Sequence, residues 1–352
     1  MSVDPDRLNQ LVGRAFGDLA AGASGVMVSL GRRLGLYKVM AGARPLTAAE
    51  IARRAECAER YVREWLGSQV ASEYLVYDAA DQTYEMTPEQ VMVLADENSP
   101  CYFPAAWEVA ASMWLDEERS ARVFKSGEGF AWGEHHPRLF CGTAAFFRNA
   151  YRGSLVPEWL PALDGVIDKL GAGARVADIG TGHGHSSLLM AEAFPRSSFH
   201  GIDVHAASIE AARANAQAAG LAERVSFEVA KSTTFTASGF DLICFFDCLH
   251  DMGDPVGAAR HAGQALASGG TVMLVEPYAE DHLEHNINPV ARLYYASSTT
   301  LCCAHSLSEP VGLALGAQAG ETRLRRVFEE AGYRHFRRAA ATPFNLILEA
   351  RV

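Results

Sequence analysis

The stretch Arg175–Gly184, Arg-Val-Ala-Asp-Ile-Gly-Thr-Gly-His-Gly, constrains the fold more than any other part of the chain. Its apolar run from Val176 to Ile179 predicts a buried strand, and the helical pattern that starts at Ser186 predicts a helix. The three alternating glycines between them permit a sharp turn and let a ligand approach the backbone closely. Asp203 follows the last glycine by nineteen residues. We therefore expect a strand, a ligand-binding loop and a helix, in this order.

From Gly173 onward, strand-like runs alternate with helical patterns, which predicts a parallel sheet with helices on both faces. The expected strands cover 175–179, 199–202, 225–229, 241–246, 271–275, about 334–339 and about 344–350, and the expected helices cover about 186–194, 206–219, 256–267 and 321–331. The segment from about 278 to 320 is too long for an ordinary connection and predicts a helical insertion. The expected fold class of residues 171–352 is α/β, with a Rossmann-like, doubly wound sheet of seven strands.

The ends of several expected strands point to one ligand site, because ligands in such sheets bind beyond the carboxyl ends of the strands. The glycine loop, Asp203, and the segments after Val229 and Phe246 all lie at such ends. A nicotinamide enzyme would normally show Gly-x-Gly-x-x-Gly. This chain has Gly-x-Gly-x-Gly, with Asp178 two residues before the first glycine, and no obvious set of residues for hydride transfer follows. The pattern favours a different nucleoside-bearing cofactor.

Composition excludes several classes of protein. The chain has 352 residues and a formal net charge of −11, so we expect no nonspecific attraction to phosphate backbones or anionic membranes. No basic apolar leader opens the sequence, and we expect no apolar run that approaches the length of a membrane span. The seven cysteines are scattered, mostly in apolar segments, which is typical of reduced thiols in a cytoplasmic protein without structural disulfides.

Residues 1–100 read as helices followed by a two-stranded wing. Apolar residues at helical spacing predict one helix over 8–19 and another that ends near Gly42. Thr47 and Glu50 form a capping-box pattern before a short helix over 48–54, and a second helix covers 59 to about 72. Strands over 75–77 and 84–86 form the wing, and Thr87-Pro88 starts another helix. This pattern predicts a mostly helical winged-helix domain.

A winged helix invites the hypothesis of a DNA-binding regulator. Met1–Pro100 contains ten Lys and Arg residues and fourteen Asp and Glu residues, whereas DNA-binding domains usually carry a basic face. The exposed positions of the expected recognition helix mix both signs of charge, and Trp65 is expected to pack in the core. We therefore favour a dimerisation module, with the helix over 8–19 as a possible exchange element between two copies.

Residues 101–170 are expected to form a helical linker and a lid over a pocket. Phe103, Trp107, Met113 and Trp114 lie roughly on one helical face, and the glycine-rich loop over 127–136 follows them. Adjacent histidines point to opposite sides in most backbone conformations, so His135 and His136 are not expected to bind one metal together. Aromatic residues at such spacing are most often core. The residues that we predict to line the pocket are Trp132, His136, Phe146, Phe147, Tyr151 and, from the later insertion, Tyr295.

The loop Val-Ala-Asp-Ile-Gly-Thr-Gly-His-Gly and the segment Phe-His-Gly-Ile-Asp203 resemble the class I S-adenosylmethionine-dependent methyltransferases. The resemblance extends over most of the chain, because a winged helix before this domain is similar to the small-molecule methyltransferases of actinobacteria and their O-methyltransferase relatives. In those relatives the winged helix mediates homodimerisation and helps to close the substrate pocket. The resemblance implies S-adenosyl-L-methionine as cofactor and a small organic acceptor, in secondary metabolism.

Specific residues take roles from this resemblance and from their chemistry. Asp203 can accept both ribose hydroxyls, the backbone of the glycine loop approaches the methionine end, and Asp178 can accept from the amino group. The complete set expected to bind the cofactor is Asp178, Gly180, Gly182, Gly184, Asp203, His205, Lys231, Ser232, Phe246, Asp247 and Cys248. For His205 and Cys248, the alternatives of a surface residue at a helix start and a core thiol stay open.

Leu249-His250-Asp251 is similar to the Leu-His-Asp-Trp segment of the O-methyltransferases, whose histidine acts as a base, although Met252 replaces the tryptophan here. In-line methyl transfer depends on holding the nucleophile and the methyl group close, and a hydroxyl acceptor also benefits from a base, so we predict that His250 deprotonates or orients the acceptor. Glu276 could orient that base or simply belong to a turn. His282 and His285 have no third compact ligand group, so no metal site is predicted. The alternative function is a winged-helix regulator that binds the cofactor as an effector.

Overall fold

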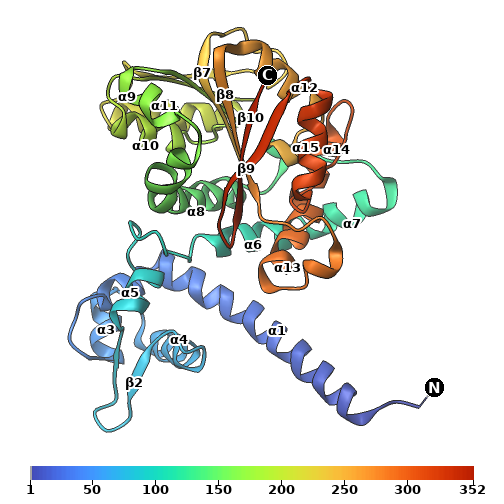
Figure 1. The fold of residues 1–352 in the computed structure, drawn as a ribbon. Helices are drawn as coiled ribbons and strands as arrows, with labels where there is room; N and C mark the ends of the chain where they lie inside the picture. The colour runs from blue at the N-terminus through green and yellow to red at the C-terminus, as the bar shows by residue number, and fades with distance from the viewer. Residues whose placement is uncertain (1) are drawn as a thin grey trace. The chain divides into compact units, whose positions relative to one another are not determined.

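The computed structural model describes residues 2–352, which divide into two compact units. One unit contains Met1–Ala111 and Cys141–Asn149, and the other contains Ser112–Phe140 and Ala150–Val352. The segment 101–170, expected as a linker and lid, is therefore shared between the two units. Each unit is described by itself (Figure 1).

The first unit has the expected winged-helix pattern. Its elements are α1 (Pro5–Arg33), α2 (Leu36–Met40), β1 (Leu46–Thr47), α3 (Ala48–Arg54), α4 (Glu59–Ala71), β2 (Val76–Asp78), β3 (Thr83–Glu85), α5 (Pro88–Leu94) and most of α6 (Ala106–Leu115). The predicted capping box before α3 is confirmed, because the Thr47 hydroxyl accepts from the Glu50 amide and the Glu50 carboxylate accepts from the Thr47 amide. The predicted wing is also confirmed. The strand β1, which has two residues and pairs with β3, was not predicted.

The expectation of two helices within residues 8–42 is wrong in part, because α1 continues for 29 residues before the short α2. Gly25 lies within α1 without ending it. A Cβ atom added there would lie 2.1 Å from the Trp107 ring, so this glycine allows a side chain to pack directly on the helix backbone. The core of this unit also contains Tyr37 and Trp65, whose indole nitrogen donates to the carbonyl of Met27. The prediction that Trp65 packs in the core is confirmed.

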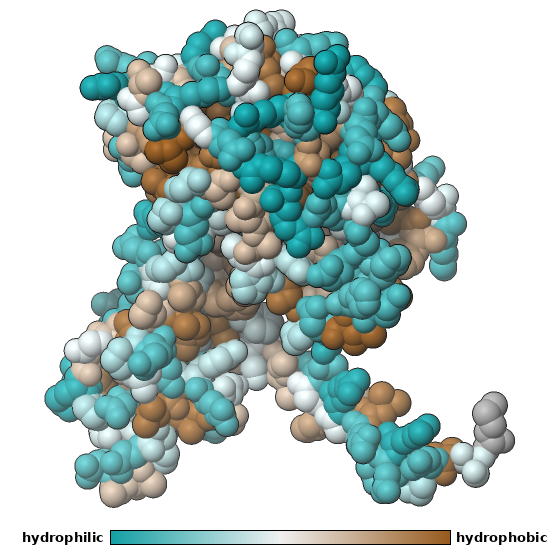
Figure 2. All heavy atoms as spheres, viewed as in Figure 1, coloured by the Kyte–Doolittle hydropathy of each residue, from teal (hydrophilic) through white to brown (hydrophobic). Residues whose placement is uncertain are grey.

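The helix α1 contradicts the expectation that no apolar run approaches the length of a membrane span. Its most apolar window of 18 residues has a mean hydropathy of 1.2, so the helix is long and apolar enough to cross a membrane by length and composition alone. Only 11% of that window is buried. A single helix of this kind is weak evidence for a membrane span. Figure 2 shows apolar side chains among polar ones along the exposed part of this helix.

The second unit is built around a sheet with the strand order β6-β5-β4-β7-β8-β10-β9, and the predicted fold class is confirmed. The strands are β4 (Arg175–Ile179), β5 (Ser198–Asp203), β6 (Val225–Val229), β7 (Phe240–Phe246), β8 (Leu266–Pro277), β9 (His335–Ala341) and β10 (Asn345–Arg351). The pairs among β4 to β8 are parallel, whereas β10 runs antiparallel to both β8 and β9. The sheet reverses strand order next to β4, which places the end of β4 at a topological switch point.

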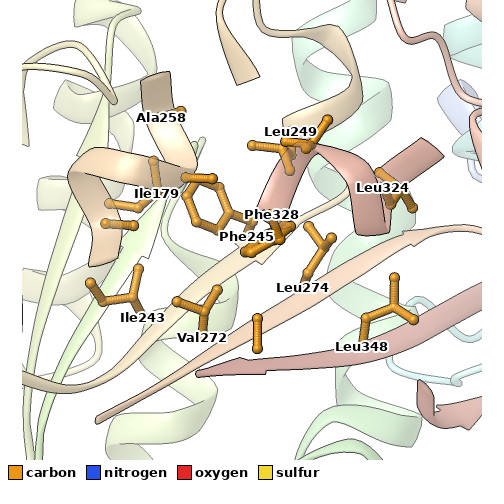
Figure 3. Close-up of a cluster of buried hydrophobic side chains, with 14 of the residues drawn as sticks. Ile179, Ile243, Phe245, Leu249, Ala258, Val272, Leu274, Leu324, Phe328 and Leu348 are labelled. Atoms are coloured by element: carbon orange, nitrogen blue, oxygen red, sulfur yellow. The ribbon is translucent and has the colours of Figure 1, made fainter. Parts of the chain in front are cut away.

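Helices cover both faces of this sheet (Figure 1). They are α9 (Val166–Ala172), α10 (His185–Ala193) and α11 (Ala206–Ala218) on one face, and α12 (Pro255–Ala265) and α15 (Gly320–Glu330) on the other. Figure 3 shows the buried cluster under α12 and α15, where Phe328 meets Phe245 and Leu274 from the sheet. Full burial of one such side chain contributes roughly 1.5–3 kcal/mol. This core holds the carboxyl ends of β4, β7 and β8 in fixed register.

The remaining elements lie outside the sheet. They are α7 (Glu117–Ser126), η1 (Trp132–Glu134), α8 (Arg138–Ser154), η2 (Leu155–Trp159), η3 (Leu160–Ala162), η4 (Leu249–Asp251), η5 (Leu283–His285), α13 (Pro289–Ser297), η6 (Ser298–Cys302) and α14 (Cys303–Ser308). The helical elements of the segment 278–320 are η5, α13, η6 and α14. Two of the short segments, η2 and η6, are π-helical.

Candidate active site

The glycine loop leaves β4 and enters α10 through three residues in the left-handed region. The φ angles of Gly180, Gly182 and Gly184 are +71°, +54° and +76°. A Cβ atom added at Gly184 would lie 2.6 Å from the Phe227 ring, whereas nothing lies within 4 Å of such an atom at Gly182. Glycine is therefore required for different reasons at different positions of the loop. Gly184 allows close packing, and Gly182 keeps an open surface that a ligand can approach.

Asp203 at the end of β5 holds this loop in place. One carboxylate oxygen accepts from the Gly182 amide at 2.9 Å, and the other accepts from the His205 amide at 2.8 Å. Burial raises the pKa of Asp203, and the two amide hydrogen bonds act in the opposite direction. The carboxylate keeps further acceptor capacity, because each oxygen has more than one lone pair.

Asp178 lies in β4 and is 1% exposed. Its Oδ2 atom accepts from three hydroxyl groups, those of Thr181 at 2.9 Å, Ser186 at 2.6 Å and Ser187 at 2.7 Å. Its Oδ1 atom is buried and has no hydrogen-bond partner among the described residues. Burial raises the pKa of this carboxyl group, against the effect of the hydroxyls. A buried carboxylate oxygen without a partner is a strong acceptor for a donor from outside the chain.

The end of β7 carries Phe246, Asp247 and Cys248. The ring of Phe246 lies 5.3 Å from that of Tyr151, centroid to centroid. Asp247 has a φ of +49°, accepts at Oδ1 from the Asn345 amide group at 2.9 Å, and has a buried Oδ2 with no partner among the described residues. Burial raises its pKa well above the ordinary value. Asp247 thus supplies a second carboxylate oxygen without a partner among the described residues. It follows β7, which is the neighbour of the strand β4 that carries Asp178.

Cys248 donates from Sγ to the carbonyl of Ile179 at 3.1 Å. A Cβ atom added at Gly180 would meet this sulfur at 2.8 Å. The thiol therefore packs against the first glycine of the loop and supports its conformation.

His250 in η4 is 4% exposed and lies between two buried partners from other elements. Its Nδ1 atom is hydrogen bonded to the Glu276 carboxylate of β8, whose other oxygen accepts from the Leu249 amide at 3.1 Å. Its Nε2 atom lies 3.3 Å from Sγ of Cys302 in η6. Burial is the largest single effect on the pKa of His250 and lowers it, but Glu276 and Cys302 together outweigh burial and hold the pKa well above the ordinary value. The Glu276 carboxylate thus fixes the orientation of the imidazole and favours its protonated form.

His205, Lys231 and Ser232 follow β5 and β6. His205 pairs through Nδ1 with the Ser208 hydroxyl at 2.8 Å, and its ring lies 4.7 Å from that of Phe140. Lys231 is exposed, and its carbonyl accepts from the amides of Thr234 and Phe235. His205 thus follows the strand next to β4, and Lys231 and Ser232 follow β6, which is the next strand beyond β5.

The predicted pocket residues lie in both units. Trp132, His136, Tyr151 and Tyr295 belong to the unit with the sheet, whereas Phe146 and Phe147 belong to the unit with the winged helix. The backbone amide of Trp132 donates to Nδ1 of His305 at 3.1 Å, which ties the loop around Trp132 to α14.

The neighbouring histidine, His135, is buried and pairs with Asp116, and Asp116 also accepts from the His136 amide. Among residues 2–352, no group of three or more His, Cys, Asp and Glu side chains could hold a metal ion.

Sequence reasoning missed several residues that the structure brings to this site. Ser186 and Ser187 are adjacent to the glycine loop, and their position in the first turn of α10 could have indicated a partner in β4. Cys302 and Asn345 lie far along the chain from their partners, and no local pattern marks them.

Comparisons with known proteins agree with this geometry. Residues 22–96 match the model of the Rv2258c-like winged HTH domain, and residues 170–332 match the model of a methyltransferase domain. A search of curated proteins gave no match.

Solved structures of similar fold span the whole chain. Human N-acetylserotonin methyltransferase in complex with S-adenosylmethionine has a TM-score of 0.72 and 16% identity, with coverage of 100% of this chain and 99% of that one. The mitomycin 7-O-methyltransferase MmcR has a TM-score of 0.68 and 18% identity, with coverage of 99% of this chain and 100% of that one. NcsB1, an O-methyltransferase from neocarzinostatin biosynthesis, has a TM-score of 0.62 and 20% identity, with coverage of 96% and 98%.

At these identities the likenesses establish the fold, and the match to the domain model establishes the enzyme class. The chain is a methyltransferase of the class I S-adenosylmethionine-dependent fold with an N-terminal winged-helix domain.

Proposed function

We propose that this enzyme methylates a proton-bearing group, such as a hydroxyl, of a small organic molecule in secondary metabolism, with His250 as the base. The observation that carries the proposal is the buried pair of His250 and Glu276 at the carboxyl ends of β7 and β8. Two structural neighbours support the substrate class. MmcR is named a mitomycin 7-O-methyltransferase, and NcsB1 was crystallised with S-adenosyl-L-homocysteine and 1,4-dihydroxy-2-naphthoic acid.

The residues around the glycine loop fit S-adenosylmethionine as the cofactor. The unpartnered Oδ1 of Asp178 suits the amino group of the methionine end, and the open surface at Gly182 suits close approach of the cofactor to the backbone. Asp203 has the acceptor capacity for ribose hydroxyls. The same proposal assigns the remaining contacts with the cofactor to the backbone of Gly180 and Gly184 and to His205, Lys231, Ser232, Phe246, Asp247 and Cys248.

When bound, S-adenosylmethionine supplies an electrophilic methyl group carried on a positively charged sulfur. The buried carboxylate oxygens of Asp178 and Asp247 favour positive charge nearby, because neither has a donor among the described residues. His250 keeps Nδ1 on Glu276, so Nε2 is the atom that takes the proton from the acceptor. Since the Glu276 carboxylate raises the pKa of His250, the neutral base becomes available only as the pH rises above the ordinary range of histidine.

The acceptor pocket is proposed to include Trp132, His136, Tyr151 and Tyr295 of the unit that contains the sheet, whereas Phe146 and Phe147 belong to the other unit and stay predictions from the sequence. Rings of this kind provide flat apolar walls for an aromatic or polycyclic acceptor. The contact of Trp132 with His305 supports an ordered wall on this side, because it joins the loop to the helical insertion.

Two measurements test the proposal. We expect Asp203→Ala to weaken binding of S-adenosylhomocysteine in calorimetry by about 10- to 100-fold, the effect of losing hydrogen bonds to a charged group. Glu210→Ala, an exposed carboxylate on α11, is the matched control and should bind as the wild type does. Binding that does not respond to Asp203→Ala would contradict the cofactor assignment.

The role of His250 is tested by His250→Ala with an acceptor found in a metabolite screen that uses methyl-labelled cofactor. Loss of a general base costs roughly 10²–10⁴-fold in kcat. Turnover close to the wild-type value would overturn the role of this residue as base. Cofactor binding should stay unchanged in this variant, because the His250 side chain is hydrogen bonded to Glu276 and Cys302.

The winged-helix unit is proposed to mediate a homodimer in the cytoplasm, with α1 packed on a second copy. The apolar side chains of this helix support the dimer, since Leu11, Phe16 and Leu19 are 63%, 72% and 71% exposed. The free thiols of Cys101 and Cys141 are exposed, which suits a reducing compartment. In α4, the expected recognition helix, Arg60 pairs with Glu64 and Arg63 with Glu59, which supports the dimerisation module over the DNA-binding regulator.

A further inference from the structure

The base nitrogen of His250 is not open in this structure. Its Nε2 atom lies 3.3 Å from Sγ of Cys302, and Cys302 is 8% exposed. Cys302 is the last residue of the π-helical turn η6, whereas Glu276 lies on the opposite side of the imidazole in β8. The three side chains form a buried row, with a carboxylate at Nδ1 and a thiol at Nε2.

Whether Nε2 carries a proton determines whether His250 or Cys302 is the donor in their hydrogen bond. The contacts of the imidazole with Glu276 and Cys302 favour its charged form against the effect of burial, so the ring carries protons on both nitrogens in the absence of an acceptor. Nε2–H then donates to sulfur, and the distance of 3.3 Å is within the range of a hydrogen bond to a thiol. A buried N–H group that lost this partner would be costly, so the sulfur stabilises the protonated form of the ring.

We propose that Cys302 is a positioning residue for the base, whose sulfur holds the Nε2 proton of His250 until an acceptor takes its place. The proposal rests on the proposed role of His250 as base and adds a determinant of the pH at which that base becomes free. As the pH rises, the protonated ring of His250 releases its Nε2 proton to solvent, and the neutral Nε2 is then free to accept. The acceptor takes the place of the sulfur at this nitrogen, and as its own bond to hydrogen breaks, the proton passes to Nε2 and the electron pair stays on the acceptor.

Other titratable groups around His250 also affect its protonation, so the variants used in the test must leave these groups unchanged. They are Glu276 from β8, Asp247 after β7, Asp251 from the same turn as His250, and, beyond Asp251, His305 of α14 and Glu309. Substitution of Cys302 leaves all of these side chains in place. Cys303 is a suitable control, because its sulfur lies 3.6 Å from the Ser298 hydroxyl and belongs to a different contact.

The primary experiment is a pH titration of the imidazole signals by NMR, with the full-length enzyme saturated with S-adenosylhomocysteine. His250→Gln identifies the signal of His250 among the twelve histidines. We expect Cys302→Ala to lower the pKa of His250 by roughly 0.5–1 unit, as expected for the loss of one hydrogen bond to the charged form. We expect Cys302→Ser to keep the pKa at or above the wild-type value, because oxygen is the better acceptor. Cys303→Ala should leave it unchanged.

A second experiment measures the pH profile of kcat/KM for the same variants. The acid limb of Cys302→Ala should move to lower pH by the same amount, an effect that a merely structural role would not produce. The proposal is overturned if Cys302→Ala leaves the pKa of His250 unchanged or raises it. If Cys302→Ala does not fold, a pKa in Cys302→Ser below the wild-type value overturns it. The titration measures the contact with Cys302 without any turnover, whereas the activity of His250→Ala tests the role of His250 as base. Failure of one proposal can therefore be distinguished from failure of the other.

Discussion

Glu276 and His250 are 26 residues apart in the chain and meet in a hydrogen bond that is almost fully buried. The parallel pairing of β7 with β8 explains the contact. Phe246 is opposite Val275, and the two strands continue side by side for one more residue. The turn η4 then returns His250 over the end of β8. The sheet register thus sets the orientation of the imidazole before any ligand binds.

Replacement of Glu276 by glutamine tests how this contact controls the base. The amide keeps the shape but removes the charge that holds the pKa of His250 above its ordinary value, so the pKa should fall. The neutral base would then be present at lower pH, and the acid limb of kcat/KM should shift to lower pH. We also expect a lower maximal kcat, by less than the roughly 10²–10⁴-fold loss for removal of the base itself. A limb that moves to higher pH would contradict this assignment.

Asp251 predicts a pH dependence of stability. Burial raises the pKa of this carboxyl group from its ordinary value of 3.8 to about 6. A group with a raised pKa contributes stability that is complete below its unfolded pKa and is lost as the pH rises through its folded pKa. Asp251→Asn should therefore stabilise the protein above pH ~6, by up to about 3 kcal/mol, and have little effect near pH ~4. Urea unfolding at both pH values measures this difference.

Glu284→Gln is the matched control for Asp251→Asn, because Glu284 is exposed in η5. Its free energy of unfolding should equal that of the wild type at both pH values. An equal effect of Asp251→Asn at the two pH values would show that the ionised carboxylate is not the cause.

The glycines of the loop predict a graded series of variants. Gly182→Ala places a Cβ atom in open space but at a φ of +54°, which costs roughly 1–2 kcal/mol. Gly184→Ala adds a clash with the Phe227 ring at 2.6 Å and should destabilise the protein further. Gly67→Ala, in the middle of α4 with nothing within 4 Å, should instead stabilise it by roughly 0.5–1 kcal/mol. Chemical denaturation of the three variants gives this order, and a different order would contradict it.

The parts of the fold that could be predicted are those with a local cause. The strands over 175–179 and 225–229 were predicted with the bounds that β4 and β6 have. The apolar residues of β4 end directly before Gly180, and apolar and polar residues alternate along β6. The capping box at Thr47 similarly fixed the start of α3. Each of these signals lies within a few residues of its effect.

The parts that could not be predicted depend on contacts between distant segments. Cys302 is 52 residues from His250 in the chain, and a cysteine in an apolar helical pattern looks the same whether or not a histidine faces it. Gly25 is a similar case. Its role is to receive the Trp107 ring, and this partner cannot be inferred from the helical pattern around it.

The exposed stripe of α1 predicts an association of the winged-helix unit. Leu8, Val12, Phe16 and Leu19 follow one another at helical spacing, and Phe16 is 72% exposed. A stable interface buries about 1,000 Å² or more in total, which a helix of 29 residues can supply when a second copy covers it. Phe16→Glu should convert a dimer into a monomer in sedimentation velocity. Gln10→Glu adds the same charge on the opposite side of the helix and should leave the dimer intact. A wild-type monomer that binds lipid vesicles through α1 would instead identify the stripe as a membrane contact, since this helix is also long and apolar enough to enter a bilayer.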